Sequence, residues 1–352
     1  MLVILADDLT GALDSAAPFA GRGFRTEIAL HRFAVHVIAE KRPDVLSINL
    51  NTREIGADDA RQATAAVIAM LPAGVRLFKK VDSRLKGNIA AELDAIPYAS
   101  ALVAPAIPEF GRIVDAGCVT GFGIDTPIVI ADKLGPHAGR AKMPDTRSSA
   151  DMDAVLDTAQ TEGTDLMIGA RGLAEALARR MTARIEAQPA AVPVGRITFV
   201  IGSRDPITLA QIDALRASHD VAYFAAPNGR LDTAPDDGER AALTLVQATP
   251  GTEAVDPHQV SELLAEALAG ECAGDRVDML AGPGTTLLLS GGATAEAVLR
   301  KLGLSSMLLH GECLPGLGLA SAGGRCVIAK SGGFGPPDTL TRIADMVLGR
   351  TT

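Results

Sequence analysis

Two adjacent carboxylates, Asp7 and Asp8, follow an apolar segment at the start of the chain, LVILADDLTG. The apolar run predicts a buried strand, so both carboxylates stand where that strand ends. In open α/β sheets this is the edge at which ligands bind. A carboxylate there accepts hydrogen bonds from ligand hydroxyls, and one of the pair could act as a general base. The alternative is that one of them only caps the following helix.

A cationic segment, FKKVDSRLKGNIAAEL, covers residues 78–93 and also follows a predicted strand. Its charged and polar candidates are Lys80, Asp82, Ser83, Arg84 and Lys86. Lysine and arginine side chains at a strand end can clamp a carboxylate or phosphoryl oxygens. Such a charge run usually forms a solvated loop, but the acidic balance of the rest of the chain favours a binding site.

Arg53, in the segment LNTREI, stands at a third predicted strand end, whereas Arg112, after APAIPEFG, is interpreted as structural. Where these strand ends are neighbours, Arg53 and the lysines face Asp7 and Asp8. Carboxylates that accept from hydroxyls, together with cations that hold a carboxylate, suit one kind of ligand. The residues therefore favour a polyhydroxy acid.

Three glycine-rich segments follow apolar runs in the second half of the chain, at residues 287–298, 308–320 and 328–340. Glycine lets backbone N–H groups approach a ligand closely, and a helix N-terminus favours an anion. Tight turns between strands and helices are the alternative, but three such segments together favour a phosphate or nucleotide cradle. Candidates in the first segment are Gly291, Gly292 and, as a hydroxyl donor, Thr294.

A fourth segment, VIGSRDPITLAQI, leaves a predicted strand at residues 200–212. Its Ser203 and Asp205 could cap the helix that follows or contact a ligand, and both interpretations stay open. The P-loop pattern G-x-x-x-x-G-K-[ST] is absent from the sequence, and the glycine-rich segments lack the third glycine of G-x-G-x-x-G. These absences argue against a P-loop ATPase and a typical dinucleotide-binding dehydrogenase.

The composition, 47% hydrophobic and 21% charged over 352 residues, is that of a globular protein with a sizeable core. A formal net charge of −9 argues against nucleic acid and anionic membranes as partners, since both attract clustered Lys and Arg. The four cysteines form no C-x-x-C pair and the six histidines lack metal-ligand spacing, so no protein metal site is expected. We expect a cytoplasmic protein, because neither a leader nor a membrane span is recognisable.

Apolar runs alternate with alanine-rich helical segments, which predicts the α/β class with mostly parallel sheets. The Ala/Pro-rich stretch 187–196 follows a predicted long helix over residues 170–187 and precedes a new strand. It predicts a boundary between two α/β domains, 1–190 and 195–352. Residues 232–240 are predicted to form an exposed acidic loop.

Taken together, these motifs resemble the four-carbon acid sugar kinase family, once filed as a domain of unknown function. The resemblance runs through both halves of the chain in the family's order, which makes it more specific than any single motif. The matching segments are residues 6–14 (ADDLTGALD), 52–53 (TR), 79–92 (KKVDSRLKGNIAAE), 105–112 (PAIPEFGR), in part 202–208 (GSRDPIT), 291–295 (GGATA), 311–316 (GECLPG) and 330–335 (KSGGFG).

The resemblance implies an N-terminal sugar-acid domain, a C-terminal ATP domain and a ligand site in the cleft between them. It implies transfer of the ATP γ-phosphoryl group, with Mg²⁺, to a terminal hydroxyl of a threonate, an erythronate or an oxo derivative. Asp8 is the candidate base, and the substrate would contact Asp7, Asp8, Arg53 and residues 80–86. The residues implied for ATP are Ser203, Gly311, Glu312, Cys313, Leu314, Gly332, Gly333 and Gly335.

Two residues depart from the family pattern: Arg84 stands where a small residue is usual, and Asp205 replaces a serine. The particular acid and the oligomeric state, with a homodimer as one option, therefore stay open. One alternative is an Asp-nucleophile phosphatase, although its D-x-D-x-T loop separates the two aspartates that are adjacent here. The other alternative is a non-catalytic binder of sugar acids or nucleotides.

Overall fold

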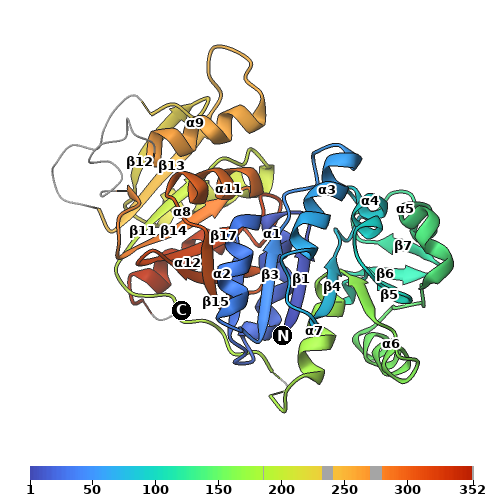
Figure 1. Cartoon of the computed structure of the whole chain (residues 1–352). Coiled ribbons are helices and arrows are strands. Elements are labelled where there is room, and N and C mark those ends of the chain that lie inside the picture. The colour runs from blue at the N-terminus through green and yellow to red at the C-terminus, as the bar shows by residue number, and fades with distance from the viewer. Residues whose placement is uncertain (185, 232–240, 270–279, 351–352) are drawn as a thin grey trace. The chain divides into compact units, whose positions relative to one another are not determined.

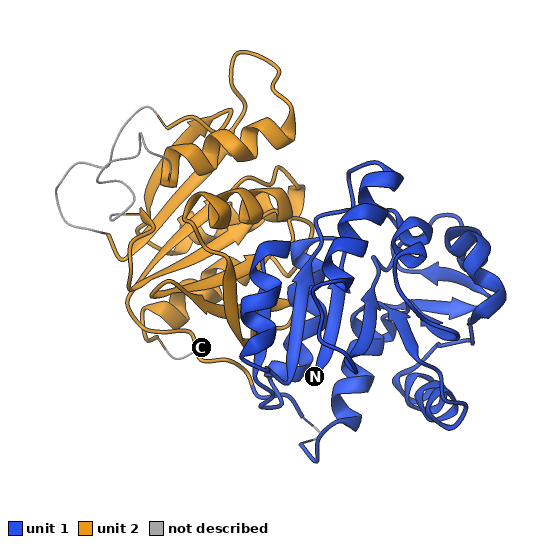
Figure 2. Cartoon of the chain, viewed as in Figure 1, with its two compact units in different colours: residues 1–188 blue, residues 189–352 orange. Residues whose placement is uncertain are grey.

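The computed structural model describes residues 1–184, 186–231, 241–269 and 280–350. The chain divides into two compact units, Met1–Gln188 and Pro189–Thr352, which Figure 2 shows in different colours. The acidic loop predicted at 232–240 lies outside the described residues. Within the described ranges, no helix is long and apolar enough to cross a membrane.

Unit 1 is built on a parallel sheet in the order β2-β3-β1-β4-β10-β5-β9. Its strands are β1 (Leu2–Ala6), β2 (Thr26–Ala29), β3 (Val45–Asn49), β4 (Arg76–Lys80), β5 (Ala101–Ala104), β9 (Ala141–Lys142) and β10 (Leu166–Gly169). Ala6 at the end of β1 pairs in register with Asn49 of β3 and Lys80 of β4. The chain therefore leaves three neighbouring strands at the same level.

Helices and a small antiparallel sheet complete unit 1 (Figure 1). Helix α1 packs against β3 and α7, and α3 packs against α4. The helices are α1 (Leu9–Ala20), α2 (Val35–Glu40), α3 (Ala57–Ile68), α4 (Ile89–Asp94), α5 (Ile130–Leu134), α6 (Ser149–Thr161) and α7 (Arg171–Arg180), with 3-10 turns at Arg32–Ala34, Pro108–Phe110 and Gly135–Arg140. The small sheet consists of β6 (Arg112–Asp115), β7 (Cys118–Gly121) and β8 (Ile128–Val129).

Unit 2 has its strands in the order β12-β13-β11-β14-β17-β16-β15. The first five are parallel, whereas β16 runs antiparallel to both of its neighbours. The strands are β11 (Arg196–Ile201), β12 (Ala222–Pro227), β13 (Leu243–Thr249), β14 (Thr285–Ser290), β15 (Ser306–Leu314), β16 (Leu317–Ala322) and β17 (Arg325–Lys330). The helices are α8 (Pro206–Ser218), α9 (Pro257–Ala269), α11 (Gly292–Lys301) and α12 (Thr339–Val347); α8 packs on α12, and α9 on α11.

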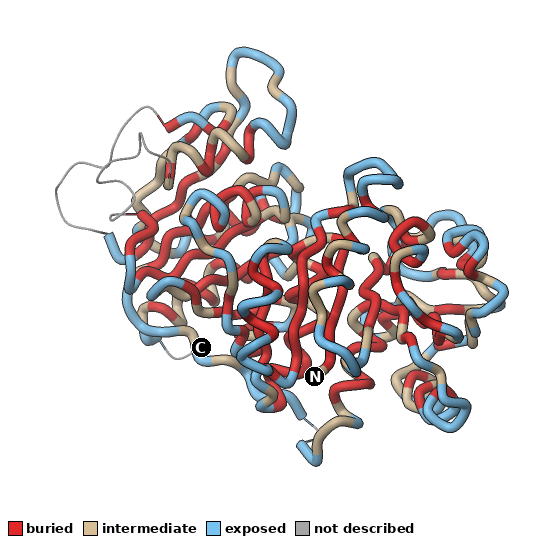
Figure 3. The backbone as a smooth tube through the Cα atoms, viewed as in Figure 1, coloured by how far each residue is buried: buried red, intermediate tan, exposed pale blue. Residues whose placement is uncertain are grey.

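Most strands of the parallel sheet in unit 1 and of the sheet in unit 2 are buried, as Figure 3 shows in red. Aliphatic side chains supply most of this core, and Phe19, Phe78 and Phe199 add large rings without solvent exposure. Strands covered on both faces need continuous apolar runs rather than alternation, which is the pattern the sequence carries. The predicted α/β class with mostly parallel sheets is confirmed.

Two local predictions were wrong. The helix expected over residues 170–187 ends at Arg180, where two arginines in its last turn complement the helix dipole. The Thr182 hydroxyl then accepts the backbone N–H of Arg184, a side-chain turn that competes with further helix. The glycine-rich strand exit expected within residues 308–320 begins later than predicted, because β15 continues to Leu314 and pairs with β16 through two register shifts.

Gly172, in the first turn of α7, is a position where the fold requires glycine. A Cβ there would overlap the carbonyl oxygen of Ala106, a backbone atom that cannot rotate away. We expect Gly172→Ala to destabilise unit 1 by about 1–3 kcal/mol, the usual cost of overpacking. Gly139→Ala is the matched control, because no heavy atom lies within 4 Å of a Cβ built there. Equal urea midpoints for the two variants would contradict this packing.

Candidate functional site

The carboxyl ends of β1 and β3 bring Asp7, Asp8 and Arg53 together in unit 1. The Arg53 guanidinium donates to both oxygens of Asp7, from Nε at 2.8 Å and Nη2 at 2.9 Å, and Nη1 donates to Asp8 Oδ2. The backbone N–H groups of Thr52 and Arg53 donate to the Asp7 carbonyl oxygen, at 2.9 and 3.2 Å. The two like charges at the end of β1 are therefore held by one bidentate cation, a strong and directional arrangement.

Asp7 is buried, with 3% of its surface exposed, and remains ionised. Burial by itself raises the pKa of this carboxyl, but the hydrogen bonds from Arg53 and the positive charges of Lys79, Arg53 and Lys80 outweigh it. The pKa of Asp7 consequently lies below its ordinary value. The same pairing raises the pKa of Arg53 against the opposing effect of burial. Both groups keep their charges at any physiological pH.

Asp8 caps α1 as well as contacting Arg53. Its Oδ1 accepts the backbone N–H of Gly11 at 2.8 Å, and its Oδ2 accepts the hydroxyl of Thr10 at 2.7 Å. The capping interpretation of the sequence is thus realised, together with a role in the charge cluster. About a fifth of the Asp8 side chain is exposed, against 3% for Asp7, so Asp8 is the carboxylate that a ligand can reach.

Lys79 and Lys80 are consecutive on β4 but have different surroundings. Lys79 is completely buried and its Nζ lies 2.9 Å from Glu92 Oε2, while the Thr52 hydroxyl donates to the other oxygen of Glu92. This lysine serves the scaffold, because its charge is neutralised inside the protein. Glu92 was not among the predicted site residues, because only the folding of the chain brings it next to Lys79.

Lys80 lies on the side of β4 that faces the start of α1. It is 5% exposed, and a Cβ built on Gly11 would lie 2.9 Å from its Nζ and 2.6 Å from Asp8 Oδ1. Among the residues that the structure describes, none forms a hydrogen bond or ion pair with this ammonium. A buried ammonium without hydrogen bonds is costly, so Lys80 is the group in this cluster best suited to bind an anion.

The loop after β4 is tied to the Arg53 segment. Gly87, at φ +88°, packs so closely that a Cβ there would lie 2.9 Å from Asp7 Oδ2. The Asn88 amide donates to the carbonyl oxygens of Thr52 and Ile55, both at 2.8 Å. The half-buried Asp82 accepts the backbone N–H of Arg84 at 2.9 Å, whereas Lys86 is exposed.

The small antiparallel sheet holds the outer part of the same loop. Arg112, on β6, donates to the Ser83 hydroxyl and to the Phe122 carbonyl oxygen, and Arg84 donates to the Gly123 carbonyl oxygen. Burial and the nearby charge of Arg84 lower the pKa of Arg112, with Asp82 opposing. Arg112, which the sequence presented as structural, thus orients Ser83, a predicted site residue.

In unit 2 the ends of β11, β14 and β17 are neighbours, since Ser290 pairs with Ile201 on one side and with Lys330 on the other. The segments that follow pack on one another without room for side chains. A Cβ at Gly202 would overlap the Thr294 hydroxyl, and one at Gly332 would overlap the Ser203 hydroxyl. These glycines are required by close approach, and the segments that follow β11, β14 and β17 form one cluster.

The loop of residues 331–335, which follows β17, has its carbonyl groups turned inward. Lys330 Nζ donates to the carbonyl oxygens of Ser331 at 3.0 Å and Gly332 at 3.1 Å. Gln211 Nε2 lies 2.9–3.1 Å from three further carbonyl oxygens, those of Phe334, Gly335 and Pro336, which share its two N–H groups. Within the described ranges, the backbone N–H groups of Gly332, Gly333 and Gly335 donate to no other residue. The amide side of the 331–335 loop is therefore available to a ligand.

The first turns of α8 and α11 border the 331–335 loop. Asp205 caps α8 by accepting the N–H of Ile207 at 2.9 Å, and Ser203 accepts the N–H of Asp205 at 3.2 Å. The helix α11 begins after Gly291, whose N–H donates to the Lys330 carbonyl oxygen at 3.0 Å, and Gly292 opens its first turn. Thr294, 2% exposed, shares a hydrogen bond with Ser261 at 3.2 Å, so its hydroxyl faces the interior.

The segment of residues 311–314 is placed differently from the other predicted nucleotide residues. The side chains of Cys313 and Leu314 belong to the hydrophobic core of unit 2, and burial raises the pKa of the Cys313 thiol to about 12. Gly311 and Glu312 precede them on β15. The following turn does reach the 331–335 loop, because a Cβ at Gly316 would overlap the Phe334 ring. Only backbone groups of Cys313 and Leu314 could therefore serve a ligand.

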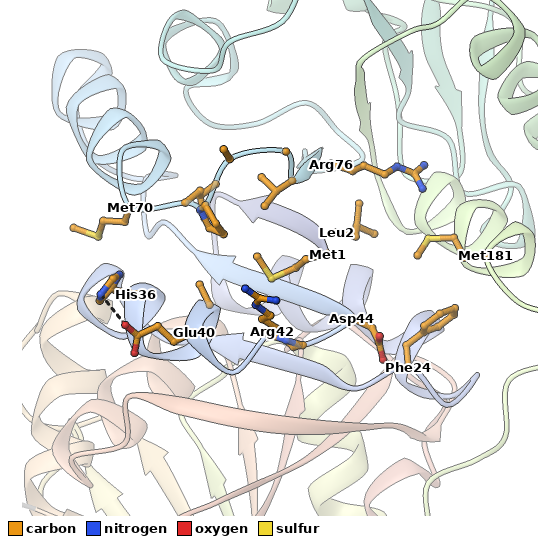
Figure 4. A pocket seen from close by; sticks show the side chains of 17 residues that line it. Met1, Leu2, Phe24, His36, Glu40, Arg42, Asp44, Met70, Arg76 and Met181 are labelled. Atoms are coloured by element: carbon orange, nitrogen blue, oxygen red, sulfur yellow. Dashed lines mark ion pairs between the residues drawn. The ribbon is translucent and has the colours of Figure 1, made fainter.

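A cavity of about 810 Å³ lies at the opposite, amino-terminal edge of the unit 1 sheet (Figure 4). Met1, Arg42, Asp44, Arg76 and Met181 are among the side chains that line it. Met1 and Arg76 stand at the beginnings of β1 and β4, so this cavity is separated from Asp7 and Lys80 by the length of the strands. It belongs to neither cluster described above.

Two family models match the two halves of the chain. Residues 2–128 match the family model described as a sugar-binding N-terminal domain, and residues 198–340 match the one described as a nucleotide-binding C-terminal domain. Two solved structures share the fold: a Salmonella typhimurium LT2 protein (TM-score 0.71, 19% identity, 97% of this chain and 98% of that one) and a Haemophilus influenzae protein (TM-score 0.69, 17% identity, 99% and 100%). The class is therefore a two-domain α/β protein whose halves match the models of a sugar-binding N-terminal domain and a nucleotide-binding C-terminal domain.

Curated relatives then give the family. The chain is 30% identical to a D-threonate kinase of Bordetella bronchiseptica, over 98% of this chain and 96% of the relative. It is 28% identical to a 3-oxo-tetronate kinase of Methylobacterium radiotolerans, over 97% of this chain and 98% of the relative. The chain belongs to the four-carbon acid sugar kinase family and is a kinase of that family, which confirms the resemblance carried by its motifs.

The different surroundings of the two consecutive lysines give a testable contrast. We expect Lys79→Met to destabilise the protein by about 3–5 kcal/mol, because it leaves Glu92 buried without its partner. Lys142→Met is the matched control, since the Lys142–Glu162 pair is exposed and such pairs contribute about 0–1 kcal/mol. Thermal unfolding followed by circular dichroism measures both. A Lys79→Met midpoint equal to that of the control would contradict the scaffold role.

Proposed function

We propose that the protein is an ATP-dependent kinase that phosphorylates a terminal hydroxyl of a four-carbon sugar acid or a close relative. Unit 1 would bind the acid and unit 2 the nucleotide. The observation that carries the proposal is the 331–335 loop, whose carbonyls are held inward while three glycine N–H groups have no partner among described residues. Successive free N–H groups form a concavity that suits phosphate oxygens.

In unit 1 the cluster offers a cation and a carboxylate side by side. The ammonium of Lys80 would hold the carboxylate of the acid, and the accessible carboxylate of Asp8 would accept a hydrogen bond from a hydroxyl. As the hydroxyl attacks the γ-phosphoryl group, Asp8 would take up its proton. Arg53 would keep Asp8 in place, since it binds both carboxylates. The loop 82–86 and its Ser83 would complete the contacts to the acid.

In unit 2 the nucleotide would rest on backbone groups and helix N-termini rather than on a lysine of a P-loop. The first turns of α8 and α11 favour negative charge, and the Gly332, Gly333 and Gly335 amides would bind phosphate oxygens. Mg²⁺ would arrive with ATP, bound chiefly by phosphate oxygens, as this ion commonly is. Phosphoryl transfer depends mostly on positioning and charge neutralisation, which such donors supply.

The geometry of Asp7 does not favour an Asp-nucleophile phosphatase. A nucleophilic carboxylate needs a free oxygen directed at the phosphoryl group. Both oxygens of Asp7 accept hydrogen bonds from the Arg53 guanidinium. That mechanism also gives no role to the free amides of unit 2, whereas a kinase uses both clusters.

The test is ADP release from Mg-ATP across D- and L-threonate, D- and L-erythronate and their oxo derivatives. We expect turnover with at least one acid and a loss of about 10²–10⁴-fold in kcat for Asp8→Asn, the usual contribution of a general base. Nucleotide affinity should be unchanged in this variant. ATP binding without turnover on any acid would move the substrate outside this class, and no ATP binding would refute the kinase.

Lys80→Met tests the anion-binding role separately. We expect the KM for the acid to rise about ten- to a hundredfold, since a hydrogen bond to a charged group contributes about 1.5–3 kcal/mol, while the KM for ATP stays the same. Lys133→Met, on the exposed surface of α5, is the matched control and should behave as the wild type. An unchanged KM for the acid in Lys80→Met would remove Lys80 from the site.

A further inference from the structure

We infer that Lys330 is a positioning residue that orients the nucleotide-binding loop from beneath and that it makes nucleotide affinity depend on pH. This inference rests on the proposed function, because it concerns the same 331–335 loop. Lys330 is the last residue of β17 and is completely buried. A buried ammonium at the end of a central strand is expensive, so its hydrogen bonds explain its presence.

All described hydrogen bonds of the Lys330 ammonium go to the segments that frame the loop. Nζ lies 3.0 Å from the Ser331 carbonyl oxygen, 3.1 Å from that of Gly332 and 3.1 Å from the Thr208 hydroxyl on α8. The Thr208 hydroxyl in turn donates to the Gly332 carbonyl oxygen at 2.5 Å. Three donors of one ammonium are thus fully used, and the first turn of α8 is locked to the start of the loop.

The carbonyl groups that accept hydrogen bonds from Lys330 and Gln211 determine which backbone N–H groups can bind a ligand. In a planar trans peptide the C=O of one residue and the N–H of the next point in opposite directions. Holding the carbonyls of Ser331 and Gly332 inward therefore turns the N–H groups of Gly332 and Gly333 outward. Gln211 does the same at the far end, where its bond to the Phe334 carbonyl frees the N–H of Gly335. This geometry predicts free N–H groups at Gly332, Gly333 and Gly335, the three that have no hydrogen-bond partner among the described residues.

Lys330 acts on the nucleotide through the loop and not by direct contact. Because its side chain has no exposed surface, the ammonium cannot reach a phosphate across the loop that covers it. A P-loop lysine, in contrast, touches the phosphates directly. Losing the Lys330 charge should therefore weaken nucleotide binding through the loop, and leave the sugar-acid site of unit 1 unaffected.

The charge of Lys330 is also close to its titration point. Burial lowers its pKa to about 8, with the carboxylate of Asp205 at the start of α8 acting in the opposite direction. Arg204, the other charged residue between β11 and α8, donates to the Thr249 carbonyl oxygen. The loop and the end of β14 present only serine, glycine and phenylalanine, so Asp205 is the charged group facing Lys330 within the described ranges.

The sign of the pH effect follows from linkage. Bound phosphates favour the protonated lysine, so nucleotide affinity should be full below pH 8 and fall as the pH rises through about 8. Deprotonation also removes one of the three donors. A phosphate group has its second pKa near 6, so the nucleotide itself does not change charge in this range.

The experiment measures Mg-ADP binding by calorimetry at pH 7 and pH 9 without sugar acid. We expect wild-type affinity to fall about three- to tenfold between the two values, and Lys330→Met to bind at least tenfold more weakly at pH 7 with no further loss at pH 9. Lys301→Met is the matched control, since this lysine pairs with Glu266 on neighbouring helices of the same unit. It should retain the wild-type pH profile.

A second pair of variants keeps the inference testable if Lys330→Met does not fold. Thr208→Val removes the hydroxyl that links Lys330 to Gly332, and Thr208→Ser retains it. We expect weaker Mg-ADP binding in the valine variant and near wild-type binding in the serine variant, with the KM for the acid constant in both.

Two results separate the inference from the proposed function. Folded Lys330→Met or Thr208→Val protein with wild-type nucleotide affinity would overturn the positioning role and leave the kinase standing. Wild-type protein that binds no Mg-ADP would overturn both.

Discussion

Polar and charged groups at the buried end of a parallel strand have to be satisfied inside the protein before any of them can be offered to a ligand. In unit 1 this constraint joins Asp7 and Asp8 to a single arginine, and Lys79 to a glutamate from the next helix. Lys80 is the buried cation that the described pairings leave over. The groups of this cluster that can bind a ligand are those that the ion pairs of the scaffold do not involve.

Unit 2 meets the same constraint with backbone groups. Its strand ends carry serine, threonine and glycine, and a single buried lysine collects carbonyl oxygens that would otherwise point at a ligand. The result is a surface rich in backbone N–H donors, which suits a polyanion without fixed positive side chains that would need counter-charges in its absence. At the carboxyl ends of their parallel strands, unit 1 thus satisfies its polar groups with ion pairs, whereas unit 2 does so mainly with backbone groups.

The strand ends could be predicted from the sequence, because continuous apolar runs and glycine-rich exits are local signals. That is why Asp7, Arg53 and Lys80, and in unit 2 the loop at residues 331–335, were recognised together. Which of two consecutive lysines is neutralised depends on Glu92, thirteen residues further on, and this is set by packing. The burial of Lys330 is likewise set by tertiary packing. The end of β15 was misjudged because Gly311 resembles the start of a loop, while the pairing with β16 keeps it in a strand.

The lowered pKa of Lys330 has a consequence for folding. In the unfolded chain this lysine titrates at its ordinary value, so between about pH 8 and that value the unfolded state carries the extra proton. The contribution of Lys330 to stability therefore improves as the solution becomes more alkaline, over the range in which its charge is lost. At neutral pH the protein keeps a charged side chain that the fold alone would be better without. The charged Lys330 thus lowers the stability of unit 2 while it orients the 331–335 loop. This is a stability–activity trade-off at one residue.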